Sequence, residues 1–91
     1  MEFKIKWTDG NYDGIDDEDI TNGYKEYCTK VECKNGEVFF AVASGMGNFV
    51  EVDVWRRDGI GTHHHVATSF TGAKRWASNL LKKYIVNNGG V

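Results

Sequence analysis

The chain of 91 residues contains no proline, and it has only two cysteines and two methionines. Without proline there is no stiff proline-rich linker, and the sequence shows neither internal repeats nor low-complexity tracts. No run approaches the roughly 18 apolar residues that a membrane-spanning helix needs. The segment from Met1 to Trp7 also lacks the apolar run of a signal peptide. We therefore expect a cytoplasmic protein with no membrane contact.

Motifs of common enzymes are missing as well. The sequence has no Gly-x-Ser-x-Gly elbow, no phosphate-binding loop and no His-Glu-x-x-His helix. Cys28 and Cys33 are five positions apart in one expected strand, which would separate their Cα atoms by about 16 Å, too far for a disulfide. So short a chain also has little depth for a water-excluding pocket. We expect a protein that is not an enzyme.

The residues that are present suffice for one folded core. Hydrophobic residues make up 41% of the chain, and twelve side chains are aromatic (three Trp, four Tyr and five Phe). Each aromatic ring buries a large apolar area with few rotatable bonds. The length leaves no room for a second core, so residues 1–91 are expected to form a single domain.

Four to five antiparallel strands are predicted. Alternation of apolar and polar residues marks 2–8, 24–33 and 49–57. An apolar run at 37–44 suits a central strand, and β-branched residues favour a fifth strand at 62–68. Between 24–33 and 37–44, Asn35-Gly36 predicts a type I′ hairpin turn, which needs positive φ at both central residues. Ser44 to Asn48 are expected to form a flexible linker.

From Ser69 the apolar period becomes that of a helix, predicted over 70–86 with Ser69 or Thr71 as its N-cap. One such helix can cover one face of the sheet. The predicted fold class is therefore α+β, an antiparallel four- to five-stranded meander with one C-terminal helix packed on one face. The other face, left to solvent or a partner, would carry Trp55, Phe49 and one of Phe39 or Phe40.

Acidic residues are concentrated between Asp9 and Asp19, where six carboxylates fall within eleven residues although the formal net charge is only −2. Such an array can imitate a phosphate backbone and occupy a basic cleft of another protein. We predict a small protein-binding domain that acts as an inhibitor or regulator, a nucleic-acid mimic, of a nucleic-acid-handling partner such as a host defence enzyme. Small phage-encoded inhibitors share this size and composition. The predicted contacts are the acidic Asp13, Asp16, Asp17, Glu18 and Asp19, with Phe49 and Trp55 as apolar anchors.

Calcium binding is a first alternative. Asp9-x-Asn11-x-Asp13-Gly14 resembles the opening half of the calcium loop of EF-hands and dockerins, and Asp17 matches the ninth position. The resemblance implies Asp9, Asn11, Asp13 and Asp17 as ligands of a calcium cofactor. It stops at the twelfth position, which is Ile20 where those loops have a carboxylate. The main hypothesis requires no cofactor.

A second alternative is nucleic-acid binding through a basic helix face, for which Arg56, Arg57, Lys74 and Arg75 supply the cations. The solvent-facing side of an amphipathic helix is also expected to carry charged residues when no ligand binds there. His63 and His65 would share one face of a strand at about 6.5 Å and could reach one zinc or nickel ion if Cys28 or Cys33 contributed. The alternative to that metal site is a polar edge strand.

Overall fold

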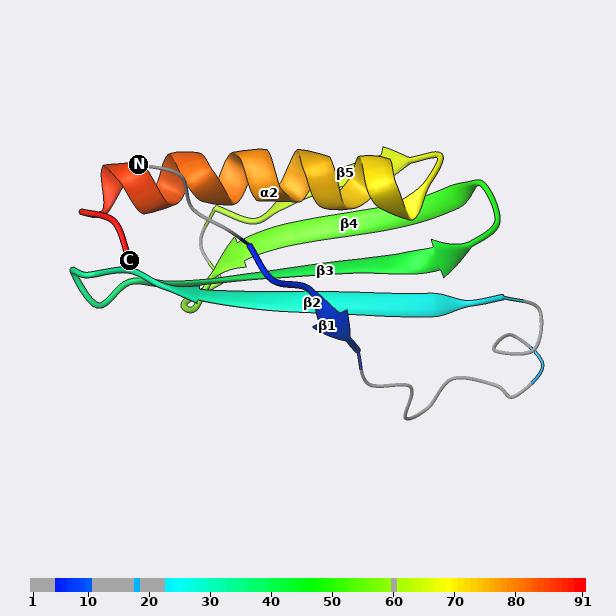
Figure 1. The fold of residues 1–91 in the computed structure, drawn as a ribbon, viewed down its shortest axis with the longest axis horizontal. Coiled ribbons are helices and arrows are strands. Elements are labelled where there is room, and N and C mark those ends of the chain that lie inside the picture. The colour runs from blue at the N-terminus through cyan, green and yellow to red at the C-terminus, as the bar shows by residue number, and fades with distance from the viewer. Residues whose placement is uncertain (1–4, 11–17, 19–22, 60) are drawn as a thin grey trace.

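A computed structural model describes residues 5–10, 18, 23–59 and 61–91. Its strands are β1 (Thr8–Asp9), β2 (Lys25–Glu32), β3 (Val38–Met46), β4 (Phe49–Arg56) and β5 (His63–Ala67), followed by helix α2 (Phe70–Asn87). The strands pair antiparallel in the order β1-β2-β3-β4-β5, and α2 lies along one side of the sheet (Figure 1). The predicted α+β meander with one C-terminal helix is confirmed.

The core lies between α2 and the two central strands. Every second residue of β4 points toward the helix, and Val50, Val52 and Val54 are fully buried there. The facing positions of β3 and α2 are largely small, so the helix can approach the sheet closely. These fully buried residues are Ala41, Ala43, Ala73 and Ala77, with Leu81 and the nearly buried Ile85 filling the remaining space. The period-two and helical patterns therefore mark the true core positions.

Helix α2 begins and ends close to where the sequence places it. Ser69 is the N-cap, and its Oγ accepts a hydrogen bond of 3.0 Å from Gly72 N. At the other end Asn88 Nδ2 donates to Tyr84 O at 2.7 Å, and Gly90 N donates to Ile85 O at 2.8 Å. These bonds satisfy main-chain groups that the last turns of a helix leave without partners.

The hairpin between β2 and β3 differs from the predicted type I′ turn. No described residue other than glycine has positive φ, so Asn35 does not, while Gly36 has φ of 89°. Gly36 N donates to Cys33 O at 3.0 Å, as in a three-residue loop that ends with a left-handed glycine. Asn35 uses its side chain instead: its Oδ1 accepts from Glu37 N and its Nδ2 donates to Asn88 Oδ1 at 2.7 Å. A contact distant in sequence therefore holds this turn.

The expectation of a flexible linker at Ser44–Asn48 was wrong. Strand β3 continues to Met46, which pairs directly with Phe49 at the start of β4. Only Gly47 and Asn48 connect them, and Gly47 has φ of 62°, as the first central residue of a type II′ turn requires. The two central strands are thus joined by a tight hairpin.

The first strand is shorter than predicted and lies later in the chain. It comprises Thr8–Asp9, residues 1–4 lie outside the described range, and Ile5 and Trp7 pack against the core instead of continuing the strand. Trp7 Nε1 donates to Ser78 Oγ at 3.2 Å, and Thr29 Oγ1 donates to Lys6 O at 2.6 Å. Side-chain bonds therefore anchor this segment over the edge of β2. Within the ranges described here, no helix is long and apolar enough to cross a bilayer.

Candidate binding surface

The side of the sheet opposite α2, called here the open face, carries the alternate residues of every long strand. The pairing register fixes its members row by row. They are Glu26, Cys28, Lys30 and Glu32 of β2; Val38, Phe40, Val42, Ser44 and Met46 of β3; Phe49, Glu51, Asp53 and Trp55 of β4; and His64 and Val66 of β5. Phe40, and not Phe39, is the aromatic residue of β3 on this face, because Phe39 is 5% exposed and stacks on Tyr84 of the helix.

An aromatic pair lies on the two central strands of the open face, near the end away from the β3–β4 hairpin. Phe40 and Trp55 are cross-strand partners, and their rings stack with centroids 5.8 Å apart at an interplanar angle of 19°. Both side chains are only partly buried. Trp55 is thus available at the surface, on a rigid platform formed by the two central strands.

A second apolar group lies at the β3–β4 hairpin end of the same face. Phe49 is 56% exposed and Met46 is 40% exposed, and they border a hollow of about 270 Å³. We call this the Met46–Phe49 hollow; its lining is Tyr24, Ser44, Gly45, Met46, Phe49 and Glu51. Three strand ends therefore contribute to one site.

Carboxylates surround these apolar groups. His64 Nδ1 lies 2.7 Å from Asp53 Oδ1, and its Nε2 lies 3.9 Å from Glu51 Oε1. Farther along the face, Lys30 Nζ and Glu32 Oε1 form an ion pair at 3.1 Å. At the end of the sheet that carries the Met46–Phe49 hollow, the described charged residues on the open face are thus acidic.

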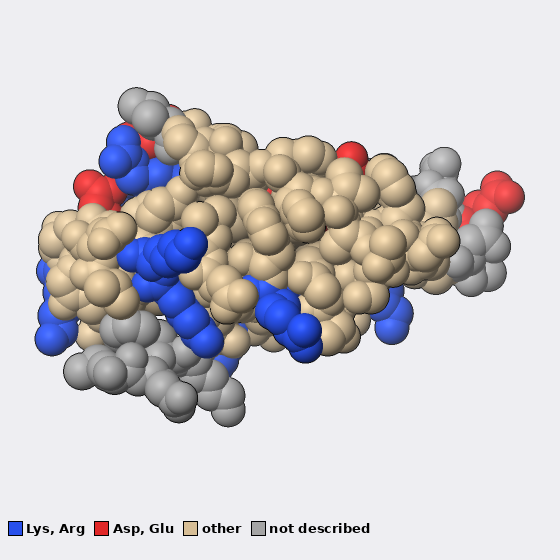
Figure 2. Space-filling model, turned by 90° about the horizontal axis from the view of Figure 1, so that it is seen from above, with Lys and Arg blue, Asp and Glu red and all other residues tan. Residues whose placement is uncertain are grey.

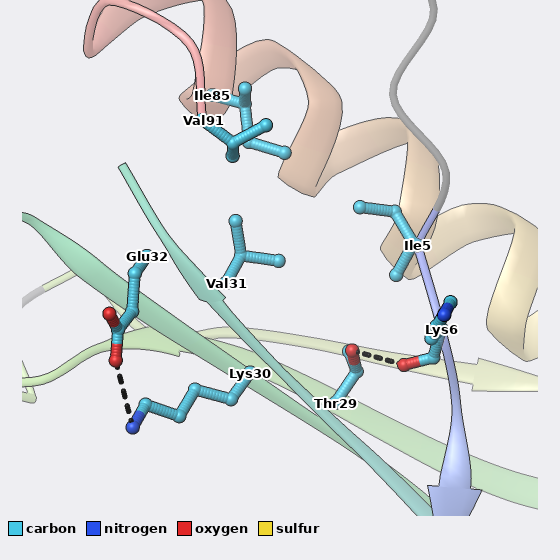
Figure 3. A pocket seen from close by; sticks show the side chains of 8 residues that line it. All are labelled: Ile5, Lys6, Thr29, Lys30, Val31, Glu32, Ile85 and Val91. Atoms are coloured by element: carbon cyan, nitrogen blue, oxygen red, sulfur yellow. Dashed lines mark hydrogen bonds and ion pairs between the residues drawn. The ribbon is translucent and has the colours of Figure 1, made fainter. Parts of the chain in front are cut away.

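A different hollow, of about 310 Å³, lies on the helix side at the edge of β2. Ile5, Val31, Ile85 and Val91 line it with aliphatic side chains, whereas Lys30 and Glu32 pair with each other away from those chains (Figure 3). The hydroxyl of Thr29 in this hollow already donates to Lys6 O. Aliphatic side chains therefore make up much of this wall, and the charged residues that also line it are Lys6, Lys30 and Glu32.

The acidic run lies largely outside the described residues. Asn11, Asp13, Asp16, Asp17 and Asp19 belong to that part, so their roles in partner or calcium binding stay predictions. Asp9 is described in β1, opposite Tyr27, and Glu18 has an exposed side chain.

The three histidines are divided between the two faces of β5. His65 stacks on Trp76 of α2 with centroids 4.8 Å apart, and His63 lies 6.1 Å from the ring of Tyr84. His64 is on the open face with Asp53. In the described ranges no three His, Cys, Asp or Glu side chains gather as metal ligands.

The two cysteines also lie on opposite faces. Cys28 is on the open face, and its Sγ lies 3.6 Å from Thr8 Oγ1. Cys33 is 6% exposed in the core. Burial, followed by the nearby charge of Glu37, raises the pKa of the Cys33 thiol above its usual value. The structure does not bring either thiol together with the histidine pair.

The four predicted nucleic-acid-binding cations have different surroundings. Arg56 donates to Asp58 through both Nε and Nη2, and Lys74 Nζ lies 3.5 Å from the centroid of the Tyr27 ring. Arg57 and Arg75 are exposed. Viewed from the helix side, Lys and Arg side chains are spread over the surface while Asp and Glu lie near its margins (Figure 2). Lys74 and Arg75 belong to the helix, whereas Arg56 and Arg57 follow one end of β4.

Sequence reasoning missed Tyr24, Met46 and Trp76. Met46 would have been found by reading Gly47-Asn48 as a two-residue hairpin turn, because that turn pairs Met46 with Phe49. Trp76 follows Ala73 at the i+3 spacing of the helical stripe. Tyr24 begins the predicted strand 24–33, and its alternation with Glu26 and Cys28 indicates the open face, although β2 itself begins at Lys25.

Comparison of the chain with protein-family models, with curated proteins and with solved structures gave no match.

Proposed function

We propose that this protein is a small non-enzymatic binding protein that docks another protein on its open face. The observation that supports this most strongly is the exposure of large apolar side chains on the side of the sheet that α2 leaves uncovered. Phe49, Met46 and Val66 are 56%, 40% and 46% exposed there. Single exposed apolar residues are common on protein surfaces, but a group of them on one rigid face marks an interaction site.

The aromatic residues provide the anchors of this surface. Phe40 and Trp55 stack on strands that are held by neighbours on both sides, so they lose little conformational freedom on binding. Tryptophan is enriched among the few residues that dominate binding free energy at interfaces. We place Trp55 toward one end of the contact and Phe49 toward the other, acidic end.

The carboxylates of the open face and of the acidic run indicate the charge of the partner's surface. Glu51 and Asp53 on the open face would repel a phosphate backbone, and the sequence adds six carboxylates between Asp9 and Asp19. A protein with a basic surface is therefore the proposed partner, and a basic cleft that normally holds nucleic acid would meet this requirement. Action as an inhibitor or regulator of such a protein follows as the biological role.

The test is capture of proteins from the native host on the immobilised domain, followed by mass spectrometry and titration of the purified partner. We expect Trp55→Ala and Phe49→Ala to lose the partner that the wild type retains. Arg75→Ala, on the exposed side of α2, is the control and should retain it. Circular dichroism verifies that each variant is folded. Equal affinity of all three variants for the purified partner would refute docking on the open face.

The electrostatic component is tested separately with Asp16→Asn, Asp17→Asn and Asp19→Asn combined. Asparagine has nearly the size of aspartate and removes like-charge repulsion, so we expect no loss of melting temperature but slower, less salt-sensitive association. Unaltered association at low salt would remove the acidic run from the mechanism.

A further inference from the structure

We infer that the Met46–Phe49 hollow receives an arginine side chain from the partner protein. This inference rests on the proposed function, because the hollow is one end of the open face. It adds the chemical identity of the group that is recognised there. The hollow measures about 270 Å³, somewhat below the range of sites for drug-sized ligands, which suits one inserted side chain.

The walls of the hollow match the apolar part of arginine. Met46 is the cross-strand partner of Phe49, and Tyr24 comes just before Lys25, which pairs with Gly45, so an aromatic residue flanks Met46 on each neighbouring strand. A guanidinium can stack on an aromatic face while its methylene stem packs against methionine. Lysine lacks the planar group that makes this stacking possible.

Glu51 provides the charge. Glu51 is one of the residues that line the hollow, and its side chain is 51% exposed. The ion pair found for it within the described ranges is a long one, 3.9 Å to His64 Nε2, and the other nitrogen of that ring lies 2.7 Å from Asp53. A partner guanidinium can therefore approach the Glu51 carboxylate and bind it through two parallel N–H groups.

The surroundings of the hollow favour the same ligand. Glu26 lies on the open face beside Ser44, one of the lining residues, and its backbone carbonyl accepts from Gly10 N at 2.7 Å. Glu26, Glu51 and Asp53 are therefore acidic residues of the open face near this end of the sheet. Their negative charge raises the local concentration of a cationic group and repels phosphate.

The test uses two synthetic peptides of equal length, one with arginine between glycines and one with citrulline in its place. Citrulline has nearly the same shape but no charge. We expect the arginine peptide, titrated into ¹⁵N-labelled protein at low salt, to shift the amide signals of Tyr24, Met46, Phe49 and Glu51. The citrulline peptide should shift them much less. Equal shifts from both peptides, or no shift with the arginine peptide at millimolar concentration, would overturn the inference.

Glu51→Gln and Glu32→Gln form a matched pair of variants. Both remove one exposed carboxylate from the open face, but Glu32 lies at the opposite end of β2 and pairs with Lys30. We expect Glu51→Gln to raise the dissociation constant of the arginine peptide by about threefold or more. Glu32→Gln should leave that constant unchanged. If both variants bound the peptide equally more weakly, the peptide would be attracted by negative charge in general, and the proposed arginine site would be wrong.

The inference and the proposed function can fail separately. If Trp55→Ala and Phe49→Ala release the captured partner but Glu51→Gln does not, the docking face stands and the arginine assignment is wrong. If none of the three releases it, the proposed function itself is wrong.

Discussion

Replacing Gly45 by alanine tests the structure of the hairpin that carries the candidate surface. Gly45 is the cross-strand partner of Val50 and lines the Met46–Phe49 hollow. A Cβ at Gly45 would collide with Phe49 O and would lie 2.9 Å from Val50 Cα. Both are main-chain atoms of β4, so no side-chain rotation can relieve the contact.

The expected cost follows from this geometry. To restore ordinary contact, β3 and β4 would have to separate locally by about 1 Å, which weakens their hydrogen bonds. Overpacking in folded proteins costs about 1–3 kcal/mol, and the upper end applies because backbone must move. For a domain of this size, about 3 kcal/mol lowers the melting temperature by about 12–24 °C.

The assay is thermal and urea unfolding followed by circular dichroism, with Gly36→Ala as the matched control. Gly36 has φ of 89° in the other hairpin, and no atom lies within 4 Å of the position that a Cβ would take there. That variant suffers only the left-handed backbone strain, about 1 kcal/mol. A Gly45→Ala variant as stable as wild type, or more stable than Gly36→Ala, would contradict the close approach of the two strands.

Two further predictions concern the helix cap and the thiols. Ser69→Ala removes the hydrogen bond from Gly72 N and should lower the free energy of unfolding in urea by about 1 kcal/mol. Thr71→Ala, the control, should change that free energy by no more than about 0.5 kcal/mol. Equal losses in the two variants would argue against Ser69 as the N-cap. A thiol reagent should label Cys28 before Cys33, because Cys33 is buried and its raised pKa leaves less thiolate at a given pH. Labelling of Cys33 should accelerate as pH increases, and Cys28→Ser should abolish the fast phase; a fast phase that persists in that variant would contradict this order.

Much of the fold was predictable because the three long strands β2, β3 and β4 and the helix each bury alternate or periodic residues on the face between sheet and helix. In β4 the valines alternate with polar or exposed residues, and that alternation alone places Trp55 and Phe49 opposite the helix. Ser69 was also predictable as the N-cap, because a serine just before an apolar helical stripe can accept a hydrogen bond from the first main-chain N–H groups of the helix. These features depend on neighbours a few residues apart.

The turns were less predictable because more than one conformation suits the same residues. Asn35-Gly36 is compatible with a type I′ turn, but the Asn35 side chain bonds to Asn88, 53 positions away, and the residue keeps a negative φ. The two glycines within Ser44–Asn48 favour a linker by composition, yet strand pairing extends to Met46. The first turn is accompanied by a side-chain contact from elsewhere in the fold, whereas the second is decided locally by the pairing of Met46 with Phe49 across Gly47-Asn48.

The sequence by itself determined the faces of the strands, the extent of the helix and the presence of aromatic residues on an uncovered side. Only the tertiary structure decided that Tyr24, Met46, Phe49 and Glu51 surround one hollow, and that Lys74 lies over Tyr27. The reason is that periodicity reports the burial of each residue along its own element. Which residues from different elements become neighbours depends on strand register and helix position, which the packing of the whole core sets.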